Sequence, residues 1–163
     1  KSFGSLGGFL VSEKRVTDYI KHHSRPFIFS AAMPPSNVAA AEKALDIIQN
    51  EPERIDRLLE VSDYMKKNFL QKELNIIRSA RTPIVPIYTY TPVRTLIACK
   101  LIFEKGVYVN PVLPPAVNNN TCLIRTICTA KHTESLIDEA TEIISDVLRK
   151  LPETEAEAIE TRV

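Results

Sequence analysis

The stretch 122–128, Cys-Leu-Ile-Arg-Thr-Ile-Cys, is short, largely apolar and preceded by a loop rich in proline and asparagine. These features predict a β-strand. Thr133 follows and can cap a helix over about 134–149, in which apolar residues recur at the spacing of one helix face. A strand followed by such a helix predicts a helix packed on one face of a sheet.

Composition indicates four further segments before this pair: a strand at 84–88, a helix at 92–105, a strand at 107–109 and a loop at 110–120. Pro86 indicates that the first strand is an edge or carries a bulge, and Gly106 ends the helix. The order β-α-β-β-α predicts a small α/β domain over 76–150, with helices on one face of a mainly antiparallel sheet.

The first half of the chain is mainly helical by the same criteria. We expect helices at about 13–22, 34–50 and 52–72, a strand end at 9–11 and an extended segment at 27–29. Ser12 can cap the first helix, and Pro26 is expected to stop it. The long helix starting at Pro52 has the character of a connecting arm.

The charges nearly cancel, with 21 basic and 20 acidic residues and a net charge of +1, so no large field favours nucleic acid or an anionic membrane. No apolar run is long enough for a membrane span, and no signal peptide opens the chain, so we expect a cytoplasmic protein. Cys99, Cys122 and Cys128 are odd in number and lie in apolar surroundings. They are typical of core residues in a reducing compartment, and we expect no metal site.

Arg125 is the one charged residue of the strand at 122–128. Strand alternation puts it on the face of Leu123 and Ile127, opposite Ile124 and Thr126. A guanidinium in apolar surroundings needs an anionic partner. That partner is either a glutamate of the same fold or the carboxylate or phosphate of a ligand.

Lys1 precedes a glycine-rich turn, Ser-Phe-Gly-Ser-Leu-Gly-Gly, whose small residues let a planar ligand approach the backbone. A desolvated lysine can form a Schiff base with an aldehyde. On these residues alone, a solvated surface lysine is the commoner interpretation. The turn is not a phosphate-binding P-loop, because its lysine precedes the glycines.

Five segments, in order and at matching spacing, resemble the α-oxoamine synthases, which depend on pyridoxal 5'-phosphate (PLP). They are the cofactor-lysine segment at 1–9, Phe-Ile-Phe-Ser-Ala-Ala-Met-Pro-Pro at 27–35, Gly-Val-Tyr-Val-Asn-Pro-Val at 106–112, the proline loop at 114–117 and Leu-Ile-Arg-Thr-Ile-Cys-Thr-Ala-Lys-His-Thr at 123–133. The similarity spans nearly all of 1–150, and the chain is identified as a member of this family.

The resemblance implies a PLP-dependent transferase of fold type I. Residues 1–50 would end the large PLP-binding domain, 51–75 would connect, 76–150 would form the C-terminal small α/β domain, and 151–163 a flexible tail. The chain would be a C-terminal portion that starts at the cofactor lysine.

Site residues follow from the same resemblance. Lys1 would be the Schiff-base lysine and the base at the substrate's α-carbon. Ser30 would contact the cofactor phosphate of the neighbouring subunit in a homodimer, where Ala31 replaces the family's threonine. Arg125 would bind the substrate's α-carboxylate, and Ala116 would line the substrate site. His132 is interpreted as structural.

The activity implied is condensation of an amino acid with an acyl-CoA, with loss of CO2 and CoA. Serine is favoured, as in serine palmitoyltransferase. Alternatives are 8-amino-7-oxononanoate synthase, which uses alanine, glycine C-acetyltransferase, and a non-catalytic interaction domain derived from such an enzyme. The family's ring-stacking histidine and ring-nitrogen aspartate precede the lysine, so we expect these 163 residues alone to be inactive.

Overall fold

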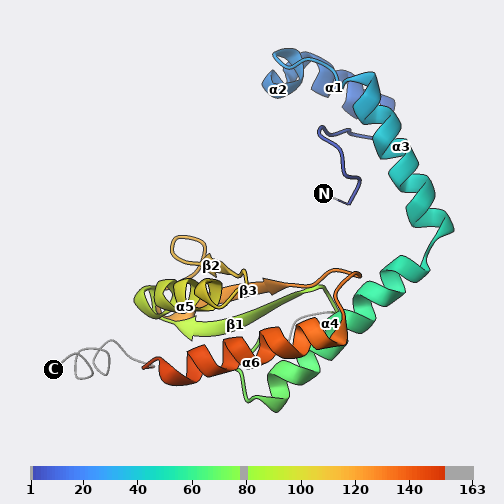
Figure 1. The fold of residues 1–163 in the computed structure, drawn as a ribbon. Helices are drawn as coiled ribbons and strands as arrows, with labels where there is room; N and C mark the ends of the chain where they lie inside the picture. The colour runs from blue at the N-terminus through green and yellow to red at the C-terminus, as the bar shows by residue number, and fades with distance from the viewer. Residues whose placement is uncertain (1, 78–80, 153–163) are drawn as a thin grey trace. The chain divides into compact units, whose positions relative to one another are not determined.

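The computed structural model describes residues 2–77 and 81–152. Its element order is α1-α2-α3-α4-β1-α5-β2-β3-α6, with one short 3-10 turn before β3 (Figure 1). The chain divides into two compact units, Lys1–Pro52 and Glu53–Val163, and each is described by itself.

The first unit consists of α1 (Lys14–His23), α2 (Arg25–Ile28) and α3 (Pro35–Asn50). Pro26 lies in the first turn of α2, where a missing N–H costs no hydrogen bond. Ser24 caps this helix, its hydroxyl accepting from the Phe27 amide at 3.5 Å. The extended segment expected at 27–29 is therefore wrong over 27–28, because Pro26 starts a helix.

Two smaller expectations for this unit also fail. Residues 9–11 have no regular secondary structure in place of the expected strand end. The N-cap of α1 is Glu13 instead of Ser12, and it makes no side-chain capping bond. No residue of the first unit is buried among those that the structure describes.

The second unit contains a three-stranded antiparallel sheet in the order β1-β3-β2, formed by β1 (Ile84–Tyr90), β2 (Asn110–Val112) and β3 (Cys122–Ile127). The expected strand at 107–109 is displaced to 110–112. The amides of Gly106 and Val107 donate back to carbonyls of the preceding helix, so the chain pairs with β3 only from Asn110 onward. The antiparallel sheet itself is confirmed.

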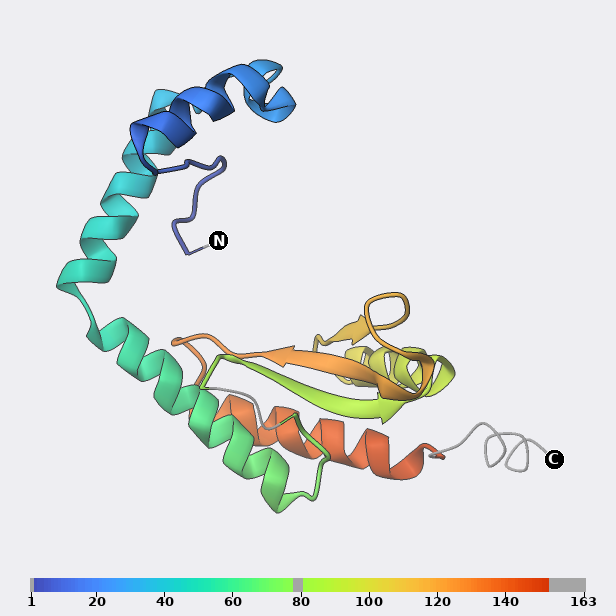
Figure 2. The ribbon, with the colours of Figure 1, turned by 180° about the vertical axis from the view of Figure 1, so that it is seen from behind.

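Three helices cover one face of this sheet: α4 (Glu53–Gln71), α5 (Pro92–Glu104) and α6 (Glu134–Lys150). Figures 1 and 2 show α4 and α6 side by side from both directions. Thr133 caps α6 as expected, its hydroxyl accepting from the Leu136 amide at 3.3 Å. The structure thus confirms helices packed on a single face.

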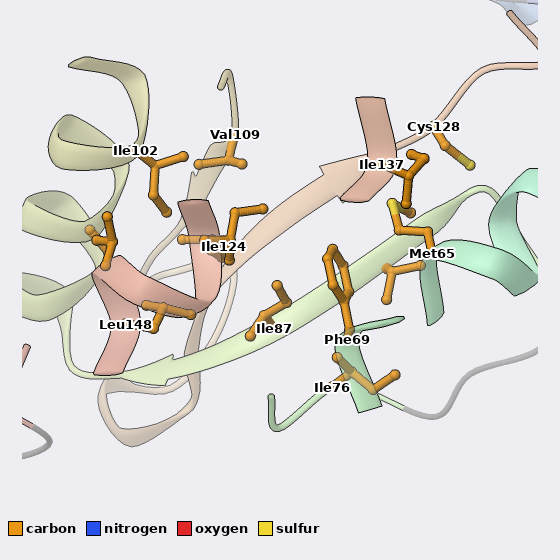
Figure 3. Packing of buried hydrophobic residues seen from close by; sticks show 14 of the residues in the cluster. Met65, Phe69, Ile76, Ile87, Ile102, Val109, Ile124, Cys128, Ile137 and Leu148 are labelled. Atoms are coloured by element: carbon orange, nitrogen blue, oxygen red, sulfur yellow. The ribbon is translucent and has the colours of Figure 1, made fainter. Parts of the chain in front are cut away.

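The core lies between this face and the helices. Ile87 and Ile124 are almost fully buried on the strands, and Phe69 of α4 is 1% exposed. In Figure 3, Met65 and Phe69 lie among Ile76, Ile87 and Ile137. The later half of α4 is thus part of the core, although its sequence has the character of an arm. Each such buried side chain contributes about 1.5–3 kcal/mol relative to exposure.

Candidate functional site

Arg125 lies in the middle of the central strand. The register pairs it with Pro86 of β1 and with Asn110 of β2. Its alternate neighbours Ile124 and Thr126 are buried against the helices, so Arg125 projects from the opposite face, as predicted from strand alternation. The sheet therefore presents a half-buried guanidinium on the face that the three helices leave open.

The Arg125 side chain lacks an anionic partner in the described part of the chain. Its Nε is shielded from solvent and meets no hydrogen-bond acceptor. The ion pairs found within 2–77 and 81–152 all join other residues, so no glutamate of the same fold compensates this charge there. A shielded cation without a partner is costly, and an anion from outside would relieve that cost.

Ala116 lies in the loop that joins β2 to β3. Its side chain is exposed, and its amide donates to the Leu113 carbonyl at 3.0 Å, which closes a turn at Pro114 and Pro115. Because β2 and β3 pair next to this loop, the loop continues from the end of the ladder that holds Arg125. No contact within the described residues assigns Ala116 a ligand, so its lining of the substrate site stays a prediction.

The glycine-rich turn fits against the segment at 30–34. Gly7 has φ +126°, and a Cβ there would meet the Met33 side chain at 2.5 Å. Gly4, at φ +57°, also has a backbone conformation that favours glycine. At Gly7 the missing side chain makes room for Met33. Lys1 itself lies outside the described residues.

Ser30 follows α2 in the first unit. Its side chain is exposed and lines a cavity of about 1200 Å³, together with residues of the glycine-rich turn and of α1 and α2. No hydrogen bond within the described residues uses its hydroxyl, which is free to contact a ligand. Ser30 belongs to the first unit, whereas Arg125 and Ala116 belong to the second.

The remaining candidates have structural roles. The His132 Nδ1 accepts from the Thr129 amide at 3.3 Å, which supports a local turn before α6. Burial raises the pKa of Cys99 to about 11 and also raises the pKa of Cys122 and of Cys128. No group of histidine, cysteine or acidic residues within 2–77 and 81–152 is arranged to hold a metal ion.

One neighbour of Arg125 was not foreseen from the sequence. Asn110 was assigned to a loop, whereas the structure pairs it directly with Arg125. The run Val-Tyr-Val-Asn-Pro-Val alternates poorly, so the start of the strand carried no clear signal.

None of the helices in the described part is long and apolar enough to cross a membrane.

Comparison with known proteins gives a consistent result. Residues 1–144 match the family described as aminotransferase class I and II. A serine palmitoyltransferase of Bacteroides thetaiotaomicron is 38% identical over 93% of this chain and 38% of its own length. An 8-amino-7-oxononanoate synthase of Bacillus velezensis is 35% identical over the same shares, 93% and 38%.

A solved structure of SPT with a PLP internal aldimine superposes with a TM-score of 0.81 at 26% identity, covering 91% of this chain and 38% of that one. The chain thus spans about 38% of the length of the curated relatives it matches.

Proposed function

Since the chain belongs to the aminotransferase class I and II family, we propose that it forms the C-terminal part of a PLP-dependent acyltransferase. The proposed enzyme condenses an amino acid with an acyl-CoA and releases CO2 and CoA. Serine is the favoured amino acid, which the 38% identity to a serine palmitoyltransferase supports.

The observation that carries this proposal is that the Arg125 side chain lacks an anionic partner in the described residues. Its guanidinium has a shielded Nε without an acceptor and no ion pair in the described residues. A planar guanidinium binds a carboxylate through two parallel hydrogen bonds. We propose that Arg125 grips the α-carboxylate of the amino acid. This grip fixes the direction of the bond from Cα to the carboxylate, and so selects the bond that breaks.

We propose that Ser30 and Lys1 contact PLP. Ser30 has a free hydroxyl on an open cavity and would donate to the cofactor phosphate, which belongs to the neighbouring subunit in the proposed homodimer. Lys1 would hold the cofactor through its ε-amine and would remove and return the proton at the substrate's Cα. PLP supplies the electron sink for the negative charge that develops at that carbon. Ala31 offers no hydroxyl, so the contact that the family's threonine would make is missing here.

The exposure of the first unit supports the proposed domain assignment. Its large apolar side chains lie in contact with solvent, including Phe9 at 81% and Phe29 at 84% exposed. Surfaces of this kind are normally covered by other protein. We therefore propose that residues 1–50 complete a larger PLP-binding domain, and that 76–150 form the small domain.

A second candidate differs only in its substrate. The 35% identity to an 8-amino-7-oxononanoate synthase supports alanine as the amino acid. Measuring CoA release by the full-length protein with serine and with alanine, each with the same acyl-CoA, separates the two. We expect the larger kcat/KM with serine.

The substitution Arg125→Lys tests the proposal. Lysine keeps the charge but cannot reproduce a two-point grip, so kcat/KM for the amino acid should fall roughly ten- to a hundredfold, or about 1.5–3 kcal/mol. The KM for acyl-CoA should change much less. Arg149→Lys, at an exposed position of α6, is the matched control and should change neither.

If Arg125 is only a structural residue, Arg125→Lys should lower the melting temperature and leave the amino-acid KM unchanged. That pair of results would end the carboxylate assignment.

A further inference from the structure

Asn110 stands directly opposite Arg125 in the antiparallel ladder of β2 and β3. Paired residues project from the same face, with Cβ atoms about 4.5–5.5 Å apart. Asn110 is half-buried, as is Arg125. The two side chains are therefore neighbours on the open face of the sheet.

The other residues directly beside Arg125, across the ladder and along its own strand, are apolar. Pro86 pairs with Arg125 from the opposite strand, and Leu123 and Ile127 flank it along β3. Of these four neighbours, Asn110 is the one with a polar side chain. Among these four, the Asn110 amide is thus the side chain that could accept a hydrogen bond from the outer nitrogens of Arg125, whose Nε is shielded and unpaired.

The amide of Asn110 is held in place by Tyr108. Its Nδ2 donates to the Tyr108 hydroxyl at 3.1 Å. The Tyr108 ring in turn lies edge-on to Phe103, with centroids 6.4 Å apart. This contact uses an N–H of the amide. Among the described residues no hydrogen bond joins the amide oxygen to Arg125, so this neutral acceptor is unused there.

We propose that Asn110 is a positioning residue that orients Arg125 for the substrate carboxylate without neutralising it. This inference rests on the proposed function of Arg125. A carboxylate at position 110 would form an ion pair with Arg125 and compete with the substrate. An apolar side chain there would leave the guanidinium without an orienting acceptor. The neutral amide avoids both outcomes.

The substitution Asn110→Asp gives Arg125 an internal anion and is the sharpest test. In the full-length protein the amino-acid KM should rise about tenfold or more, because the substrate must displace an ion pair. The KM for acyl-CoA should stay within about twofold. Asn120→Asp, the same change at an exposed position of the β2–β3 loop, should leave both constants unchanged.

Melting temperature provides a second readout that does not depend on activity. The new carboxylate beside Arg125 should have a lowered pKa, so the ion pair stabilises the folded state at neutral pH. That gain should disappear in acid, below about pH 4, as the carboxylate takes up a proton. Asn110→Asp should therefore melt higher than Asn120→Asp at pH 7 and lose this advantage in acid.

The outcomes separate the two claims. If Arg125→Lys raises the amino-acid KM while Asn110→Asp leaves it and the melting profile unchanged, the role of Asn110 is overturned and the grip of Arg125 stands. If Arg125→Lys has no effect on the amino-acid KM, the proposed function itself fails. If Asn110→Asp does not fold, the variant Asn110→Ala tests the claim instead. A severalfold rise in its amino-acid KM would support the positioning role of Asn110, and an unchanged KM would overturn that role.

Discussion

Arg125 and the three cysteines are all at least partly shielded side chains, but only the arginine carries a charge that burial penalises. The thiols respond to burial by staying protonated, which makes them inert core residues. A guanidinium cannot lose its charge in this way and needs an anion. At the residue scale, Arg125 is therefore the one among these four side chains that needs an anionic partner.

The cysteines give a prediction at this scale. With its pKa raised to about 11 by burial, Cys99 should hold almost no thiolate at pH 8. Native protein should therefore react with iodoacetamide much more slowly than protein unfolded in guanidinium. Rapid labelling of Cys99 at pH 8 in the native state would contradict the burial seen here.

The raised pKa of Cys99 also predicts that the folded state loses stability in alkali. The folded state keeps the Cys99 proton up to a pKa of about 11, whereas the unfolded thiol loses it near its ordinary pKa of 9.0. Between these values the unfolded state binds fewer protons, so the free energy of unfolding falls as pH rises. Cys99→Ala should flatten that fall in a pH series of denaturant melts.

At the scale of helices and strands, caps and pairing decide the boundaries. Thr133 ends the loop after β3 and starts α6 through its hydroxyl, which accepts from the Leu136 amide. Thr133→Ala should therefore lower the free energy of unfolding by about 1 kcal/mol. Thr133→Ser keeps the acceptor and should recover most of it. An equal loss in both variants, measured by urea melts, would show that the cap is unimportant.

The second unit could be predicted in outline because its helices and strands carry local signals. Each signal lies within a few residues of the chain: the cap at Thr133, the helix end at Gly106 and the strand alternation around Arg125. The exceptions depend on longer contacts. Pro26 can end one helix or start another, and Ser24 decides this through its capping bond. Asn110 joins β2 only because β3 lies beside it.

The site was predictable to a smaller extent. Strand alternation identified the face of Arg125. No local pattern, however, decides between the two partners considered, a glutamate of the same fold or a ligand anion, and no such glutamate pairs with it in the described residues. The small residues of the glycine-rich turn indicated room for a ligand, but at Gly7 the neighbouring side chain is that of Met33, 26 residues later in the chain. Such contacts across the sequence are not encoded in a short motif.

At the scale of the whole molecule, the two units differ in how they are stabilised. The buried residues of the described chain all belong to the second unit, while the helices of the first present their apolar faces to solvent.

We expect residues 1–163 alone to release no CoA from an acyl-CoA with serine or alanine. The family resemblance assigns the acid at the cofactor's ring nitrogen and the stacking group to positions before Lys1. Measurable amino-acid-dependent release by this chain would contradict that expectation.

The most direct test of the central claim is CoA release by the full-length protein with PLP, serine and a long-chain acyl-CoA. The account predicts release that requires both the cofactor and the amino acid and that Lys1→Ala abolishes. We also predict that Arg125→Lys raises the KM for serine without raising the KM for acyl-CoA. Release at the wild-type rate by Lys1→Ala would contradict the account.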